Sequence, residues 1–206
     1  MHKWGLTPIH AATATTLIAG VRRLPQSVML VAMSGVDREF REVVGAFATG
    51  VCVVTSEHHG HPAGMTLNSF TSVSLEPLLV LVSLAHGSRT LEKATASRRF
   101  AVNILHRRQQ EVALDFAKRG AEFPRNHAMQ DRFGYFAVRH ALALLRCEVT
   151  DIVRAGDHDL VIGEVASFEG SGGEPLVFHR GTFGGLDEDA RVPSGRVIGL
   201  DNGTGW

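Results

Sequence analysis

The sequence predicts a mainly β fold, a barrel decorated by two or three short helices. Six or more segments of strand length, rich in apolar and β-branched residues, follow one another along the 206 residues. Strands do not alternate regularly with long helices, as a doubly wound parallel sheet would require. The hydrophobic content of 44% and the charged content of 20% are those of an ordinary globular domain.

Residues 34–50 have the pattern of an amphipathic helix. Ser34 is suited to cap this helix, with the acid Asp37 three residues later, and Gly50 is expected to end it. The apolar residues that recur at helical spacing on one face are Phe40, Val43, Val44 and Phe47.

The segments that follow predict strands. The β-branched stretch 51–56 and the stretch 63–67 are expected to pair through a turn at residues 57–61. The continuous apolar run 78–84 predicts a central strand that is buried on both faces.

The second half of the chain predicts two more helices and the remaining strands. Ser88 can cap a short helix that runs to residue 96, and residues 120–134 are polar and irregular, as expected of a loop. A helix at 109–119 would pack through Val112, Leu114 and Phe116. The further strands are expected at 100–105, 141–153, 159–168 and 176–179, with turns at 154–158 and 169–174.

Charge and cysteine content narrow the class of protein. Because 21 basic residues balance 21 acidic ones, no general attraction to nucleic acid or to an anionic membrane is expected, and no apolar run is long enough to cross a bilayer. Cys52 and Cys147 lie in apolar, strand-like segments far apart in the sequence. Two buried free thiols in a cytoplasmic protein are expected, with a structural disulfide as the alternative.

The two ends of the chain differ from the middle. Residues 1–36 contain no acid and faintly resemble a transit peptide, and we expect them to form a disordered extension. Translation that starts at Met29 or Met33 is a further interpretation of this segment. Residues 187–206 are polar and Gly-rich and predict a flexible tail, which leaves 37–186 as the folded domain.

Five blocks in a fixed order carry a family resemblance. They resemble the short-chain flavin reductases that serve two-component flavin-dependent monooxygenases, on the FMN-binding split β-barrel, and the resemblance covers residues 37–186. The blocks are 47–55 (FATGVCVVT), 64–77 (GMTLNSFTSVSLEP), 100–105 (FAVNIL), 156–158 (GDH) and 175–181 (PLVFHRG).

The resemblance implies an enzyme, an NAD(P)H:flavin oxidoreductase. It would use NADH or NADPH to reduce FMN or FAD and release the reduced flavin to a separate monooxygenase, and it would be a homodimer. The choice within each cofactor pair and the identity of the monooxygenase stay open. A flavoenzyme on the same barrel with another hydride acceptor, or a non-catalytic flavin carrier, are the alternatives.

The same resemblance assigns the flavin contacts. One segment would line the flavin, a second would contact the ribityl chain and phosphate, and a third would run beside the ring with its backbone amides. A helix start would bind the phosphate with its free N–H groups and with an arginine. These contacts are Pro62, Ala63, Gly64, Met65 and Thr66; Asn68 and Ser69; Ser83, Leu84 and Ala85; Ser88, Arg89 and Thr90; and, against the ring, Phe116.

Several of these residues could instead have a purely structural role. The serines and Asn68 can simply cap a turn, and Arg89 can be a solvated surface residue. Asp115 stands where some members of the family carry a basic residue, which weakens any phosphate contact there.

The nicotinamide contacts implied by the resemblance lie far downstream. His158 would contact the reduced dinucleotide, although a histidine in a turn can also just bond its neighbours. Hydride transfer needs orientation of two cofactors rather than a nucleophile or a general base, and none is expected. The resemblance also implies a strand segment that completes the nicotinamide pocket, which consists of Val177, Phe178, His179 and Arg180.

Two other cofactor-site patterns are not supported by the sequence. A Gly-x-Gly-x-x-Gly motif after a strand and a P-loop are both missing, so a Rossmann mode of dinucleotide binding is not predicted. The cluster His58, His59 and His61 falls in an expected turn without a nearby cysteine pair, and no metal site is expected there.

Overall fold

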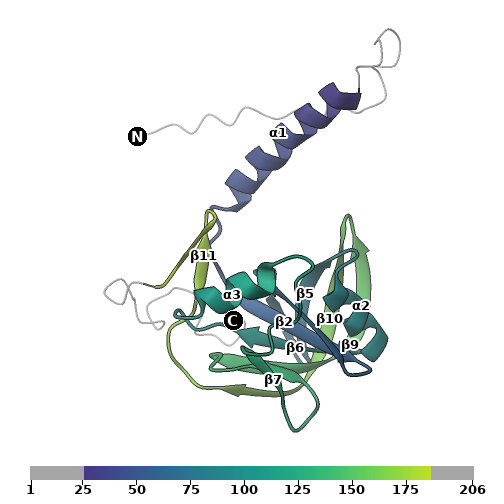
Figure 1. Ribbon diagram of the computed structural model, residues 1–206, viewed down its shortest axis with the longest axis vertical. Helices are drawn as coiled ribbons and strands as arrows, with labels where there is room; N and C mark the ends of the chain where they lie inside the picture. Colours follow the sequence, from purple (N-terminus) through teal and green to yellow (C-terminus); the bar gives the residue numbers. More distant parts are fainter. Residues whose placement is uncertain (1–25, 187–206) are drawn as a thin grey trace. The chain divides into compact units, whose positions relative to one another are not determined.

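The computed structural model describes residues 26–186, with side chains from residue 35 onward. Two units are distinguished: the helix α1 (Gln26–Val44) and a β-rich unit that begins at Gly45 (Figure 1). The expected disorder of residues 1–25 and 187–206 concerns segments outside the described residues.

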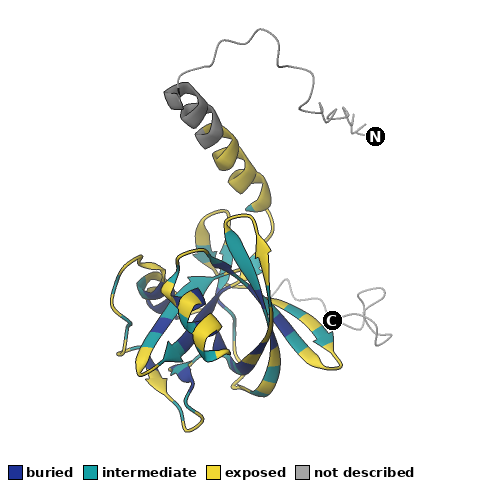
Figure 2. Cartoon of the chain, turned by 90° about the vertical axis from the view of Figure 1, so that its right-hand side faces the viewer, coloured by how far each residue is buried: buried dark blue, intermediate teal, exposed yellow. Residues whose placement is uncertain are grey.

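Helix α1 differs from its prediction at both ends. It begins at Gln26, so Ser34 lies inside the helix instead of capping it. It ends at Val44, and Gly50 belongs to strand β1 (Thr49–Gly50). The apolar residues of its predicted face are exposed, as the yellow colour of this helix in Figure 2 shows.

The β-rich unit is built on one antiparallel seven-stranded sheet. Two small sheets accompany it, one of β1, β11 (Val177–His179) and β12 (Thr182–Gly184), the other of β7 (Ala128–Gln130) and β8 (Phe136–Val138). The large sheet has the order β3 (His61–Leu67), β2 (Cys52–His58), β6 (Arg99–Ile104), β9 (Ala143–Ala155), β10 (His158–Gly170), β5 (Leu78–Ala85) and β4 (Thr71–Leu75). The prediction of a mainly β fold is confirmed.

Strand β2 is buried on both faces, whereas β5 is buried on only one. Cys52 and Val54 pack into one apolar cluster, whereas Val53 of the same strand packs into another on the opposite face. In β5 the buried residues Val80, Val82 and Leu84 alternate with more exposed ones, so the prediction of a doubly buried strand at 78–84 is wrong. The physical reason is the cover of the second face: Val53 packs with Val112 and Phe116 in that second cluster, whereas no residue of β5 belongs to it, so only one face of β5 meets the core.

Two short helices cover this sheet. Ser88 caps α2 (Arg89–Ser97) as predicted, since its Oγ accepts a hydrogen bond of 3.2 Å from the N–H of Leu91. In α3 (Gln110–Ala117) Val112 and Phe116 are buried as predicted, but Leu114 is 54% exposed and Ala113 lies in the core instead. Leu114 therefore faces solvent.

A long hairpin of β9 and β10 turns at Gly156 and Asp157 and appears in Figure 1 as two long neighbouring strands. Gly156 has a φ of +64°, which glycine adopts without strain. Within β10, Gly163 lies against the ring of Phe100, which a Cβ there would approach to 2.5 Å. The hairpin therefore needs glycine at its turn and at this contact with the core.

Cys52 and Cys147 are buried free thiols, as expected. Burial raises the pKa of each thiol to about 12. Among the described residues, no helix combines the length and the hydropathy that a membrane span requires.

Candidate functional site

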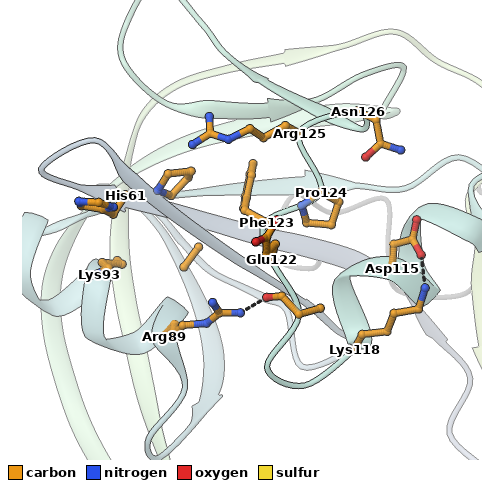
Figure 3. Close-up of a pocket in the computed structure, with 13 residues that line it drawn as sticks. His61, Arg89, Lys93, Asp115, Lys118, Glu122, Phe123, Pro124, Arg125 and Asn126 are labelled. Atoms are coloured by element: carbon orange, nitrogen blue, oxygen red, sulfur yellow. Dashed lines mark hydrogen bonds and ion pairs between the residues drawn. The ribbon is translucent and has the colours of Figure 1, made fainter.

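An open cavity of about 800 Å³ lies between β3, α2, α3 and the loop after α3 (Figure 3). Strand β3 contributes residues 61–63, and α2 contributes Arg89 and Lys93. Asp115 of α3 and Lys118 just beyond it form another wall, and residues 121–126 close the remaining side. A volume of this size lies in the upper part of the range of roughly 300–1,000 Å³ for small-molecule sites.

A small pocket of about 20 Å³, which shares Pro62, Ala63 and residues 121–124 with the cavity, has an aromatic lining that includes Phe116 and Phe123. Gly64 lies so close to Phe116 that a Cβ would approach two ring atoms at 2.7 and 2.9 Å. Phe123 packs edge-on against Phe116, with ring centroids 5.5 Å apart, and against Phe136 at 5.1 Å. The contact with the Phe116 ring therefore requires glycine at position 64. The sequence had predicted a different reason for this glycine, the close approach of a flavin.

Thr66 connects β3 to α3. Its Oγ1 donates a hydrogen bond of 2.6 Å to the carbonyl oxygen of Ala113. The hydroxyl proton is used inside the protein, and the oxygen keeps acceptor capacity for a ligand donor.

The loop at 121–126 is held at both of its ends. Arg89 donates through Nη2 to the carbonyl oxygen of Ala121, and Nε2 of His127 lies 2.8 Å from Oδ2 of Asp115. Nζ of Lys118 lies 2.7 Å from the other oxygen of the same carboxylate. The hydrogen bonds from Lys118 and then from His127 lower the pKa of Asp115, so this carboxylate is ionised and paired at neutral pH.

The cavity carries an excess of positive charge. Four cationic side chains line it, and of the two acids there, Asp115 is paired with Lys118 and His127. Glu122 is the second acid. The cationic residues are Arg89, Lys93, Lys118 and Arg125. A ligand with anionic groups matches this lining.

A pair of hydrogen bonds joins two of the predicted flavin segments. Ser69 Oγ accepts from the N–H of Ser83 at 3.1 Å and donates to the carbonyl oxygen of Ser83 at 3.2 Å. Strand β4 pairs with β5 only as far as Leu81. Ser83 is the next residue of β5 whose backbone groups face the β4 side, and the Ser69 hydroxyl takes the place of a partner strand there. Because amides alternate along a strand, Ala85 directs its N–H to the same edge as Ser83.

His158 lies opposite Ala85 in the ladder between β10 and β5. Nδ1 of His158 lies 2.8 Å from Oδ1 of Asp157, and its hydrogen bond lowers the pKa of that carboxyl. Since the ionised carboxylate can only accept, Nδ1 carries the proton, and Nε2 remains available to a ligand. The loop before α2 is tied to the same end of the hairpin, because the N–H of His86 donates to the carbonyl oxygen of Asp157 at 3.0 Å.

The segment 177–180 lies in a different sheet. Phe178 pairs with Thr49 of β1, and its ring packs near that of Phe183 at 5.4 Å. Arg180 and Gly181 have φ values of +46° and +79° and form the turn into β12. None of these residues is among those that line the cavity, and within the described chain the ladders do not join this strand to β10.

The predicted flavin residues divide into three groups. The side chains of Leu84 and Thr90 are buried, and the side chain of Met65 packs partly against the core. These three residues could therefore contact a ligand only through their backbone groups. Asn68 is exposed. Pro62, Ala63 and Arg89 line the cavity, and Gly64 and Phe116 line the small pocket beside it. Those that make the contacts described above without lining the cavity are Thr66, Ser69, Ser83, Ala85 and Ser88.

Sequence reasoning missed one side of the site. Residues 120–134 were expected to be only a loop, yet this loop supplies Phe123 and Arg125 to the cavity, and α2 supplies Lys93. The spacing of Lys93 four residues after Arg89, which puts both on one helix face, was the available signal.

Comparisons with known proteins identify the family of this chain. The family described as "Flavin reductase like domain" matches residues 44–187, which include every predicted contact. The curated protein "Probable flavin reductase" of Rhizobium meliloti (strain 1021) is 44% identical over 157 residues, 71% of this chain, and the chain spans 48% of its length. The reductase component of the 4-nitrophenol 4-monooxygenase/4-nitrocatechol 2-monooxygenase of Rhodococcus opacus is 38% identical over 146 residues, 71% of this chain and 79% of that protein.

Solved structures are similar as well. The NADH:FAD oxidoreductase SgcE6 of Streptomyces globisporus C-1027, in complex with NAD and FAD fragments, has a TM-score of 0.71 and 34% identity. The match covers 75% of this chain and 95% of that one. Sequence, fold and site agree, and the chain belongs to the flavin reductase like domain family.

Proposed function

We propose that this protein is an NAD(P)H:flavin oxidoreductase that reduces FMN or FAD and releases the product to a separate monooxygenase. The observation that carries the proposal is the convergence of two distant blocks: Ser69 binds the backbone of Ser83, and two residues further along the same strand Ala85 lies opposite His158. Flavin and nicotinamide contacts predicted from different parts of the chain thus lie on neighbouring strands, with Ser83 and Ala85 directed to the edge of β5 that faces away from β10.

The residues at this edge fit a flavin. The N–H of Ala85 is directed outward and suits the polar edge of the ring, where a reduced flavin carries negative charge. The start of α2 and the guanidinium of Arg89 suit its phosphate. The bound cofactors supply hydride transfer from nicotinamide to flavin, and the protein orients the two rings and limits access of water.

His158 is the residue we assign to the nicotinamide. With its Nδ1 proton held by Asp157, it presents Nε2 as an acceptor, which suits a carboxamide N–H. The segment Val177–His179 and Arg180 would complete the nicotinamide pocket only with a rearrangement or with a second subunit, because in one chain it belongs to another sheet.

A homodimer and a partner monooxygenase belong to the same proposal. Exposed apolar side chains on and next to β4, namely Val73, Leu75 and Leu78, support a subunit contact. The name of the Rhodococcus opacus relative, a monooxygenase reductase component, supports an oxygenase partner. The two buried free thiols support a cytoplasmic location.

The test is NADH and NADPH oxidation by the purified protein under air, with FMN, FAD or no added flavin. Fast oxidation that depends on added flavin and saturates with it is the expected result. Tight flavin binding without oxidation of either nucleotide would indicate a carrier, and oxidation that ignores added flavin would indicate another hydride acceptor.

A further inference from the structure

The cavity extends beyond the predicted phosphate contact. The edge of β5 assigned to the flavin ring, at Ser83 and Ala85, is not among the residues that line the cavity, and neither is His158 on the neighbouring strand β10. Arg89 at the start of α2 is, and residues 121–126 form the far wall. A flavin whose ring lies at that edge and whose first phosphate lies at Arg89 leaves most of the cavity for whatever follows the phosphate.

The chemistry of the remaining space is that of a nucleotide. Lys93 lies one helical turn after Arg89 on the same face of α2, and its side chain is only 21% exposed. Its Nζ lies 3.0 Å from Oε1 of Glu92. Because the Glu92 side chain is 68% exposed, this ion pair is weak, and a ligand phosphate can replace the carboxylate as the partner of Lys93. Figure 3 shows Arg125 and Arg89 on opposite sides of Phe123.

An apolar wall lies between these cations. Phe123 is fixed by its edge-on contacts with Phe116 and Phe136, and Pro62 and Pro124 flank it in the cavity lining. A rigid ring with prolines beside it offers a stacking surface for a planar base, since aromatic rings stack with bases of any sequence. Cations on both sides and an apolar wall between them match an adenosine phosphate.

We infer that this cavity binds the adenosine monophosphate half of FAD, with Lys93 and Arg125 as contacts of its phosphate, and that the protein therefore selects FAD over FMN. This inference rests on the proposed function, because it takes the flavin ring to lie at the Ala85 edge. FMN ends at its single phosphate and leaves these two cations without a partner from the ligand.

The test compares the dissociation constants of FAD and FMN, measured by fluorescence titration without nicotinamide cofactor, for the wild type and for Lys93→Gln, Arg125→Gln and the double variant. Arg119→Gln is the matched control, because Arg119 is an exposed cation next to Lys118 that does not line the cavity. AMP serves as a competitor for each flavin.

The wild type is expected to bind FAD more tightly than FMN, and each single variant to weaken FAD about tenfold, the loss of one charge-assisted contact, with FMN changed less than twofold. AMP should displace FAD and not FMN, and Arg119→Gln should behave as the wild type. Equal affinities in the wild type, or an equal loss of both flavins in the variants, would overturn the inference.

A second arm distinguishes the two sources of an adenosine monophosphate group. If the variants leave both flavin affinities unchanged but raise KM for NADH, the cavity serves the nicotinamide dinucleotide and the assignment to FAD is wrong. If FAD binds as expected and neither NADH nor NADPH reduces it, the proposed function fails while the inference about the cavity holds.

Discussion

Ser69 and Ser83 are joined by two hydrogen bonds, in which the Oγ of Ser69 accepts from the N–H of Ser83 and donates to its carbonyl oxygen. This contact continues the edge of β5 beyond the last residue that β4 pairs, which is Leu81. It fixes the segment after β3 against the strand that lies beside His158. The proposed site depends on this connection.

Replacement of Ser69 by alanine removes both hydrogen bonds. We expect the free energy of unfolding to fall by about 1–3 kcal/mol, since two partly buried backbone groups lose their partner. Flavin affinity should fall as well, because the edge at Ala85 loses its support. Urea unfolding and flavin titration measure the two effects. Ser69→Thr keeps the hydroxyl and is the control; a Ser69→Ala variant with unchanged flavin affinity would contradict this role.

Gly64→Ala places a methyl group against Phe116, at 2.7 and 2.9 Å from two ring atoms. The ring cannot retreat freely because it packs on Phe123, so we expect a loss of stability of about 1–3 kcal/mol, as for other overpacked cores. Gly50→Ala, where a Cβ would meet nothing within 4 Å, should cost much less. Recovery of stability in Gly64→Ala/Phe116→Leu would confirm the cause, and equal stability of the two single variants would refute it.

His158→Ala should raise KM for NADH about tenfold, if the histidine contributes one hydrogen bond worth ~1.4 kcal/mol. The flavin dissociation constant should stay unchanged. Asp157→Asn should produce a smaller effect in the same direction, since the carboxylate holds the proton on Nδ1 and leaves Nε2 to the ligand. Loss of flavin binding in His158→Ala would mean that the residue belongs to the flavin site instead.

The buried thiols make stability depend on alkaline pH. Burial raises the pKa of both Cys52 and Cys147 from 9.0 to about 12, so the folded chain keeps two protons that the unfolded chain releases above pH 9. Their contribution is complete below pH 9 and is lost as the pH rises toward 12, with a slope of up to about 1.4 kcal/mol per pH unit for each thiol.

Urea unfolding at pH 8 and at higher pH measures this slope. The double variant Cys52→Ala/Cys147→Ala should show a shallower one, although it is less stable throughout. A thiol reagent at pH 8 should modify neither cysteine until the chain unfolds, and rapid labelling of the folded protein would contradict their burial.

The strands with strong β-branched or apolar patterns could be predicted from the sequence, whereas the short ones could not. Strands β7, β8 and β12 have three residues each, which is too few for a periodic pattern. They form because β7 pairs with β8 and β12 pairs with β11. The run 78–84 was assigned to a strand buried on both faces because composition does not reveal which faces of a strand other elements cover.

The candidate site was predicted in part for a similar reason. The resemblance identified Pro62 and Arg89, but only the register of β5 and β10 shows that Ala85 and His158 are neighbours. Arg125 was missed because a cation in a loop carries no local sign of the cavity that it faces, and Lys93 was missed because its helical spacing from Arg89 was not used. Gly64 was identified for a ligand, and the structure shows that Phe116 already occupies the space beside it.

The central claim is that the protein reduces free flavin and releases it. The most direct measurement mixes a small amount of protein without oxygen with NADH and a large excess of FAD or FMN, and follows the absorbance of oxidised flavin. Our account predicts that all of the excess flavin is reduced in repeated turnovers. Reduction of no more flavin than there is protein, or of none with either NADH or NADPH, would contradict it.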